Sequence, residues 1–356
     1  MSEDWSELQA HQAAAGATFQ IRENGLTLPV SFGNEAAALE TVHSGVALVD
    51  RSHWGRLEVR DADRLRYLHN QTTNTFETRQ PGEGCDTVFV TSTARTLDLV
   101  TAYVLEEAVL LLVSPNRRES LMTWMDRYIF FADRVKLTDV TDRTVAFSLL
   151  GPTSDRLIEK LGAGHLVGQP HAHHCLVTFR EMPVQVGVGS GLATPGYTLI
   201  ADRTIAGPLW QQLADWGAIP LGEDLWQRLR IEQGRPMPDH ELTEDTNPLE
   251  AGLWSAVSFN KGCYIGQETI ARLDTYQGVK QHLWGVRWSG DPVELGTVLT
   301  IADERVGKLT SQVATATGMV GLAYLRTKAG EVAGRSVQMG NVTATIVDLP
   351  FVTRGR

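Results

Sequence analysis

The strongest constraint on this chain is a short segment bounded by glycines in its last third. Residues 261–268 read Lys-Gly-Cys-Tyr-Ile-Gly-Gln-Glu, so Cys263 lies between Gly262 and Gly266. Glycines allow backbone angles and close approaches that a side chain would prevent, and the segment therefore predicts a shaped turn rather than the interior of a strand. Residues 267–273 contain no glycine or proline and predict a short helix directly after the turn.

Cys263 has two interpretations at this level. A cysteine close to a lysine and to the start of a helix is favoured in the thiolate form, which is the nucleophile and the metal ligand. Lys261 and the predicted helix supply both features. The alternative is a small buried apolar side chain, as most free cysteines are. The local residues leave both interpretations open.

Length and composition predict a globular protein of two or three domains. The chain has 356 residues, of which 42% are hydrophobic and 21% are charged. Its net charge of −10 and its pI of about 5.5 argue against direct binding of nucleic acid, which favours a basic face. The longest apolar run, residues 108–113, is far shorter than a membrane span.

The cysteines and the first residues predict a reducing, cytoplasmic location. Three widely separated cysteines do not suggest a disulfide framework. Residues 1–10 are acidic and lack the apolar run of a secretory signal and the arginines of a transit peptide.

The pattern of strands and helices predicts an α+β fold with a separate β-barrel. A strand, a capped helix and a β-meander occur once before residue 143 and in similar form after it, which suggests two related α+β layers. A helix is predicted over 115–131. Regular short strands then predict a small barrel, over 282–288, 298–301, 305–311, 319–325, 336–339 and 342–347. We therefore expect domains at 1–142, 143–275 and 276–356.

Two clusters invite functional interpretations that their spacing does not support. His171, His173, His174 and Cys175 are too close together to converge on one ion, so no metal site is predicted. Residues 187–191 form a G-x-G-x-G pattern, but a strand rather than a helix is predicted after it, which excludes a dinucleotide fingerprint. His53 fits either acid–base chemistry or a structural role.

Three segments carry a resemblance to a known family. Residues 261–268 resemble the signature of the YgfZ-type folate-binding proteins, which are relatives of the glycine-cleavage T-protein, an aminomethyltransferase. Residues 229–236, Leu-Arg-Ile-Glu-Gln-Gly-Arg-Pro, are similar to the T-protein family, and residues 45–74 resemble its opening segment. The resemblance covers nearly the whole chain from about Ala37. The resemblance implies a T-protein-like α+β fold, with two related α+β domains around a central folate channel and a C-terminal β-barrel.

The same resemblance implies a set of site residues. Cys263 and Lys261 would be the functional pair, and folate contacts would come from Arg230, Asp98, Tyr197 and Gln267. The chain departs from the family pattern at three positions. Ala94 stands where a turn glycine is usual, Leu99 occupies the usual place of an acidic residue, and Thr198 replaces a glutamate.

The implied function is tetrahydrofolate binding in support of the assembly or repair of iron–sulfur enzymes. Folate, iron–sulfur proteins and their assembly factors would be the partners, and tRNA modification would be affected indirectly. A folate-dependent aminomethyltransferase or demethylase is the first alternative. The second is a non-catalytic interaction scaffold, which the three departures favour. The sequence leaves open whether the protein is an enzyme.

Overall fold

The computed structural model describes residues 3–21, 27–329 and 332–355. The chain forms two compact units, each assembled from three segments. The first unit comprises Met1–Tyr67, Phe76–Asp86 and Val100–Gln227, and the second comprises Leu68–Thr75, Thr87–Leu99 and Arg228–Arg356. Because the chain passes between the units several times, the expected boundaries at 142/143 and 275/276 stay predictions.

A six-stranded sheet organises the first unit, with the strand order β10-β11-β12-β9-β3-β13. Only β13 runs parallel to its neighbour, β3. Side chains from the helices, including Ile158, Leu161 and Trp210, join the strands in one hydrophobic core. The elements are β3 (Ala47–Asp50), β9 (Thr144–Leu150), β10 (His174–Phe179), β11 (Met182–Val188), β12 (Gly196–Asp202), β13 (Ile219–Leu221), α1 (Glu3–Ala14), α2 (Glu35–Ser44), α5 (Ser154–Leu161) and α6 (Ala206–Asp215).

A second sheet has the order β5-β6-β7-β4-β8. Every residue of β7 is buried, as expected from its continuous apolar sequence. The helix predicted over 115–131 is shorter in the structure, because Pro115–Arg117 form a 3-10 turn before α4 begins. The elements are β4 (Gly55–Arg60), β5 (Gly84–Val90), β6 (Thr96–Val104), β7 (Ala108–Val113), β8 (Lys136–Asp139), α3 (Arg64–Gln71) and α4 (Arg118–Asp126).

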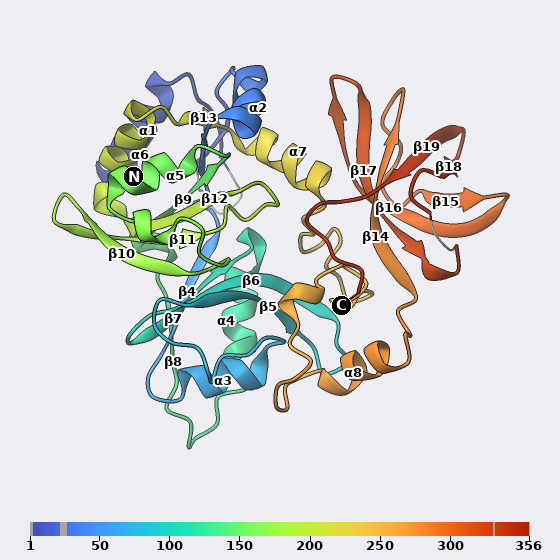
Figure 1. The fold of residues 1–356 in the computed structure, drawn as a ribbon, viewed down its shortest axis with the longest axis horizontal. Coiled ribbons are helices and arrows are strands. Elements are labelled where there is room, and N and C mark those ends of the chain that lie inside the picture. Colours follow the sequence, from blue (N-terminus) through green and yellow to red (C-terminus); the bar gives the residue numbers. More distant parts are fainter. Residues whose placement is uncertain (1–2, 22–26, 330–331, 356) are drawn as a thin grey trace. The chain divides into compact units, whose positions relative to one another are not determined.

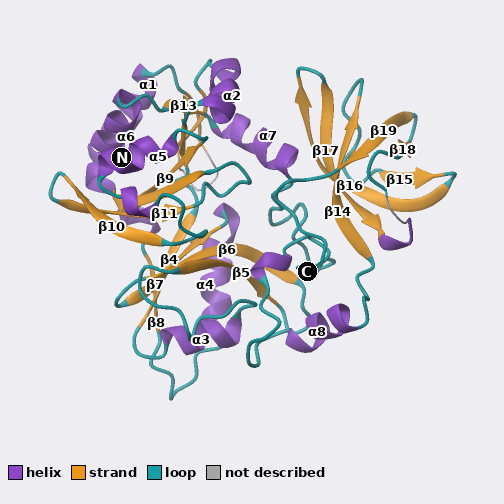
Figure 2. Cartoon of the chain, in the orientation of Figure 1, coloured by secondary structure: helices purple, strands orange, loops and turns teal. Residues whose placement is uncertain are grey.

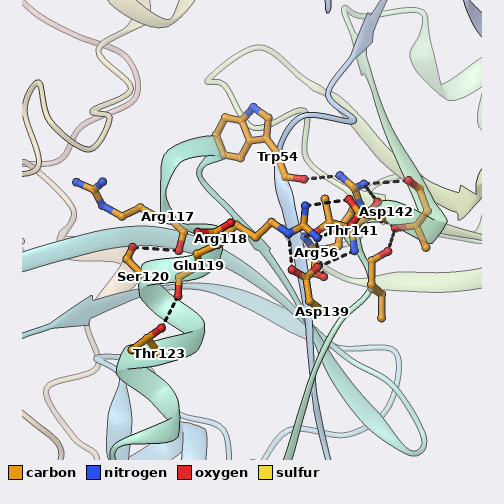
Figure 3. A network of polar contacts seen from close by, with 12 residues as sticks. Trp54, Arg56, Arg117, Arg118, Glu119, Ser120, Thr123, Asp139, Thr141 and Asp142 are labelled. Atoms are coloured by element: carbon orange, nitrogen blue, oxygen red, sulfur yellow. Dashed lines mark hydrogen bonds and ion pairs between the residues drawn. The ribbon is translucent and has the colours of Figure 1, made fainter. Parts of the chain in front are cut away.

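A buried arginine on β4 holds the end of this second sheet (Figure 3). The Arg56 guanidinium is fully buried and donates to the carbonyls of Ser52, Trp54, Thr141 and Thr144 and to the Thr144 hydroxyl. Burial lowers the pKa of Arg56 to about 10, which still leaves it charged at neutral pH. Because all five of its N–H groups are bonded, the buried charge acts as a structural link.

The second unit contains a closed six-stranded barrel, drawn in orange and red in Figure 1. Its strand order is β14-β17-β16-β15-β18-β19, and all neighbouring pairs are antiparallel. This confirms the predicted barrel. Its strands are β14 (Gln281–Trp288), β15 (Val298–Ile301), β16 (Glu304–Thr315), β17 (Gly318–Arg326), β18 (Ser336–Met339) and β19 (Val342–Val347).

The segment between α7 and α8 is mostly loop, as Figure 2 shows. Gly234, with φ +86°, follows α7 (Glu223–Gln233), and Pro236 comes shortly after, which is the predicted stop pattern. The remaining elements are α8 (Gln267–Thr275), β1 (Thr18–Ile21), β2 (Thr27–Ser31) and the 3-10 turns Thr141–Arg143, Gly164–Leu166, Arg203–Ile205, Trp254–Ala256 and Thr327–Ala329.

None of the helices over residues 3–21, 27–329 and 332–355 has the length and apolar character needed to span a membrane.

Candidate functional site

The cysteine loop, residues 258–266, presents Cys263 at the surface of the second unit. Cys263 is exposed, so the interpretation of a buried apolar side chain is wrong. The loop is fastened to the segment that ends α3. The Ser258 N–H donates to the Thr73 carbonyl at 2.9 Å, and the Ile265 N–H donates to the Asn70 carbonyl at 3.1 Å. The thiol is therefore carried by a loop whose backbone is held on both sides.

Lys261 attaches the cysteine loop to the same segment through three further hydrogen bonds. Its ammonium donates to the carbonyls of Thr72 and Asn74 at 2.7 and 2.6 Å, and also to the carbonyl of His69. It also lies 4.7 Å from the centroid of the Tyr264 ring. An ammonium has three donors, and these three bonds use all of them. The structure therefore changes the expected role of Lys261, whose ammonium is directed at backbone carbonyls and holds the loop in place.

Gly266 joins the cysteine loop to α8. It takes the left-handed conformation, with φ +81°, and is the N-cap residue of the helix. A Cβ atom here would lie 2.8 Å from the Thr91 carbonyl and 3.2 Å from the Ala94 Cα. Ala94 itself has φ +60°, in the turn between β5 and β6. The close packing of this turn explains the need for Gly266, and the positive φ of residue 94 is a conformation that glycine adopts readily.

Arg230 lies inside the second unit, at the end of α7. Its guanidinium donates to Glu241 at 3.0 Å and to the Ser311 hydroxyl at 3.2 Å, and both charged side chains are almost fully buried. Glu241 also accepts from the hydroxyls of Ser311 and Thr310. Arg228, on the same helix, forms an ion pair with Glu232 at 2.9 Å.

Comparison with known families identifies the chain. The model of the GCVT N-terminal domain matches residues 8–261, which is more than half of the sequence. The chain belongs to the GCVT family.

Curated and solved relatives agree with this GCVT assignment. The chain is 44% identical over 338 residues to “Putative transferase At1g60990, chloroplastic” of Arabidopsis thaliana, covering 94% of this chain and 77% of that protein. It is 28% identical over 349 residues to an aminomethyltransferase of Halalkalibacterium halodurans, covering 93% of each. The crystal structure of the glycine cleavage system aminomethyltransferase T from Bartonella henselae superposes with a TM-score of 0.83 at 19% identity, over 98% of each chain. The T-protein-like fold is therefore confirmed.

Asp98 and Leu99 lie on β6 of this GCVT-family chain, and both are buried. Neighbouring residues of a strand point to opposite faces, so only one of the two can face a given ligand. Leu99 packs in an apolar cluster with Val88 and Ile231. Asp98 is therefore the carboxylate that stays a candidate ligand.

The structure places Tyr197 in a core, and its expected contact with folate stays a prediction. Tyr197 is 3% exposed and belongs to the hydrophobic core of the first unit. Its hydroxyl donates to Asp155 at 2.7 Å, and burial together with this carboxylate raises its pKa. The neighbouring Thr198 donates to the Gly189 carbonyl at 2.7 Å. Tyr197 is thus a packing residue, because the alternation along β12 directs it into the core.

Gln267 is the first residue of α8 and is half-buried. Its backbone N–H donates to the Tyr264 carbonyl at 3.2 Å. It lies four residues after Cys263 on the same attached segment. Its contact with folate stays a prediction.

The histidine-rich segment holds no metal centre within the described part of the chain. His174 is buried and its Nε2 lies 3.0 Å from the Val104 carbonyl, whereas His171 forms an ion pair with Asp86 at 3.0 Å. Burial raises the pKa of the Cys175 thiol, which disfavours the thiolate. These side chains are therefore engaged separately.

The G-x-G-x-G pattern at 187–191 is explained by packing. A Cβ atom at Gly187 would lie 2.5 Å from the Tyr103 ring, one at Gly189 would lie 2.5 Å from the His171 ring, and one at Gly191 would lie 2.8 Å from an Arg51 nitrogen. Each glycine leaves room for a side chain of the same unit. These contacts account for the three glycines without a bound nucleotide.

Sequence reasoning missed the partner of His53. Its Nε2 lies 3.5 Å from the Glu223 carboxylate, and both side chains are buried. Next to this pair, the Arg51 guanidinium contacts the rings of both Trp54 and Trp226, at 3.7 and 4.4 Å from their centroids. The partners are separated by some 170 residues in sequence, so no local pattern could have paired them.

Proposed function

We propose that this GCVT-family protein is a YgfZ-type folate-binding protein that supports the assembly or repair of iron–sulfur enzymes through Cys263. The observation that carries the proposal is the presentation of Cys263 by a loop with a fixed backbone. Lys261, Ser258 and Ile265 hold the loop through hydrogen bonds, while the thiol itself is exposed. Such a thiol is available to an iron–sulfur protein or an assembly factor, and any effect on tRNA modification would be indirect.

Tetrahydrofolate is the proposed cofactor, and this chain retains two suitable buried groups. Arg230 offers a guanidinium held by Glu241, and Asp98 offers a carboxylate that can accept from a pterin N–H. Gln267 would add an amide. When bound, the folate would supply the capacity to carry a one-carbon unit. Thr198, which donates to the Gly189 carbonyl, takes no part in this set.

Folate binding is tested by anaerobic calorimetric titration of the full chain with tetrahydrofolate and its formyl and methyl derivatives. We expect saturable binding that Arg230→Ala weakens at least tenfold, since the guanidinium would lose a charge-assisted contact. Arg228→Ala is the matched control on the same helix, because Arg228 pairs with Glu232, and it should bind like the wild type. Absence of binding at millimolar folate would refute the cofactor assignment.

The role of the thiol is tested separately, in a deletion strain in which the activity of an iron–sulfur enzyme is measured. Cys263→Ser should fail to restore activity, whereas Cys175→Ser, at the half-buried cysteine, should restore it. Full rescue by Cys263→Ser would remove the thiol from the function.

A folate-dependent aminomethyltransferase or demethylase is the second candidate, favoured by the match to aminomethyltransferases over 93% of the chain. Leu99 argues against it, because its side chain lies in an apolar cluster where an acidic residue is usual. Transfer of an aminomethyl carbon to tetrahydrofolate by the purified protein would establish this alternative. A non-catalytic scaffold would instead retain partner binding without folate.

A further inference from the structure

The second unit contains a cavity of about 500 Å³ that none of the proposed site residues line. Its walls come from the C-terminal end of α8, the Trp254–Ala256 turn, the start of β14 and the end of the described chain. Cavities of roughly 300–1,000 Å³ accommodate small organic molecules. This volume is therefore sufficient for a small organic ligand.

Arg354 gives the cavity a fixed positive group. Its Nε and Nη2 donate to the Leu283 carbonyl at 3.2 and 3.0 Å, and its Nη1 donates to Asp348 at 2.9 Å. The guanidinium also lies flat on Trp284, 3.5 Å from the ring centroid. A guanidinium has five N–H groups, so two are left without a hydrogen bond to the described residues. The contacts with Leu283, Asp348 and Trp284 fix the guanidinium, so these two donors have a set position.

His282 contributes a second polar group to the lining. Its Nδ1 is buried and has no hydrogen-bond partner among residues 3–21, 27–329 and 332–355. Burial, and then the charge of Arg354, lowers the pKa of His282, so the ring is neutral at physiological pH. A buried ring nitrogen without a partner is unfavourable, and a rotation of the His282 ring that let a bound ligand reach it would relieve this.

The other lining side chains set the shape of the cavity and limit the negative charge that a ligand can carry. Trp254 offers an aromatic wall, and its indole N–H is fixed by a bond to the Leu249 carbonyl at 3.2 Å. Leu273 and Val279 add apolar surface. Asp274 places one carboxylate on the same lining, which disfavours a ligand with two negative charges.

We propose that this cavity binds a small aromatic monocarboxylate. The carboxylate accepts from the two remaining Arg354 donors and from His282, and the ring packs against Trp254, Leu273 and Val279. A guanidinium matches the planar carboxylate in geometry as well as in charge. This site is additional to the proposed folate site.

Ligand-detected NMR on the full chain tests the proposal with benzoate as the probe. We expect benzoate to bind, with benzamide at least tenfold weaker because it lacks the charge, and phthalate weaker because it has two charges. Arg354→Gln should reduce benzoate affinity at least tenfold. His282→Phe should reduce it severalfold, and this variant keeps the test decisive if Arg354→Gln does not fold.

Arg287→Gln is the matched control, since Arg287 is an exposed arginine on β14, outside the lining, and its binding of benzoate should be unchanged. Equal loss in this control, or equal binding of benzoate and benzamide, would overturn the proposal. Displacement of benzoate by tetrahydrofolate would also overturn it, by showing that the cavity belongs to the folate site. Benzoate binding in a protein that binds no folate would support this inference while refuting the proposed cofactor.

Discussion

Two glycine-rich segments of this protein use their glycines for different purposes, one for close packing and one for the exposure of a thiol. In the segment 187–191, which begins on β11, all three glycines leave space for large side chains of the first unit. In the cysteine loop, only Gly266 is tightly packed, and Gly262 lies beside Cys263 with its nearest neighbour, the His69 ring, at 3.6 Å from a Cβ position. In the first segment the glycines make room for neighbouring side chains, whereas the second segment exposes a thiol. A glycine pattern therefore indicates close approach, and only the partner reveals whether packing or presentation is the reason.

The largest effect on stability is expected from Gly187→Val, near the end of β11. The new Cβ would lie 2.5 Å from the Tyr103 ring, and the strand pairing with His174 limits any backbone shift. We expect a loss of about 2–3 kcal/mol in the free energy of unfolding, measured by urea titration. Adding Tyr103→Leu should recover part of this loss. No recovery would show that the clash does not involve that ring.

Gly266→Ala should have the next largest effect, about 2 kcal/mol, because the position combines φ +81° with a contact of 2.8 Å to the Thr91 carbonyl. Gly262→Ala is the matched control in the same loop, and a change within about 0.5 kcal/mol is expected there. Equal destabilisation by the two variants would contradict the division of roles between these glycines.

Lys261→Met should destabilise the protein by about 1–2 kcal/mol, since three carbonyls lose a charged donor. Hydrogen exchange of the Ile265 amide, which donates to Asn70, should become faster. Lys308→Met, at an exposed site on the barrel, should leave that exchange unchanged. Unaltered exchange in Lys261→Met would mean that the loop is held by its backbone bonds alone.

A smaller loss of stability is expected at low pH, through His174 on β10. Burial lowers its pKa below the value of 6.5 for a free histidine. The unfolded chain therefore binds the proton more readily, so stability is complete above about pH 6.5 and falls as the pH drops towards the folded pKa. Urea midpoints at pH 7.5 and 5.5 should differ less in His174→Gln than in the wild type. A residual difference is expected from His240 and His282, whose pKa values burial also lowers.

Several features were predictable because they depend on local sequence. Three barrel strands, β15, β18 and β19, have the predicted bounds, since period-two alternation and turn residues define short strands well. The helix stop at Gly234 was equally clear. The helix over 115–131 was predicted too long, because Pro115 initiated a 3-10 turn and the apolar spacing continued beyond Asp126.

The candidate site was predictable only in part. The sequence located the cysteine segment and placed Cys263 in a turn before a helix, which the structure confirms. It could not show that the Lys261 ammonium donates to the carbonyls of His69, Thr72 and Asn74, because these residues are 192, 189 and 187 positions away. Nor could it show that Tyr197 lies in the core, since the burial of one strand face depends on the whole sheet.

The sequence by itself determined the α+β fold, the barrel and the helix that begins shortly after Cys263. Periodicity, glycines and prolines act over a few residues, so they can be read along the chain. Only the tertiary structure decided the partners of Lys261, Arg230 and His53, and it alone formed the cavity beside Arg354. The physical reason is that buried charges and cavities are defined by groups brought together from distant segments, whose pairing is a property of the packed chain.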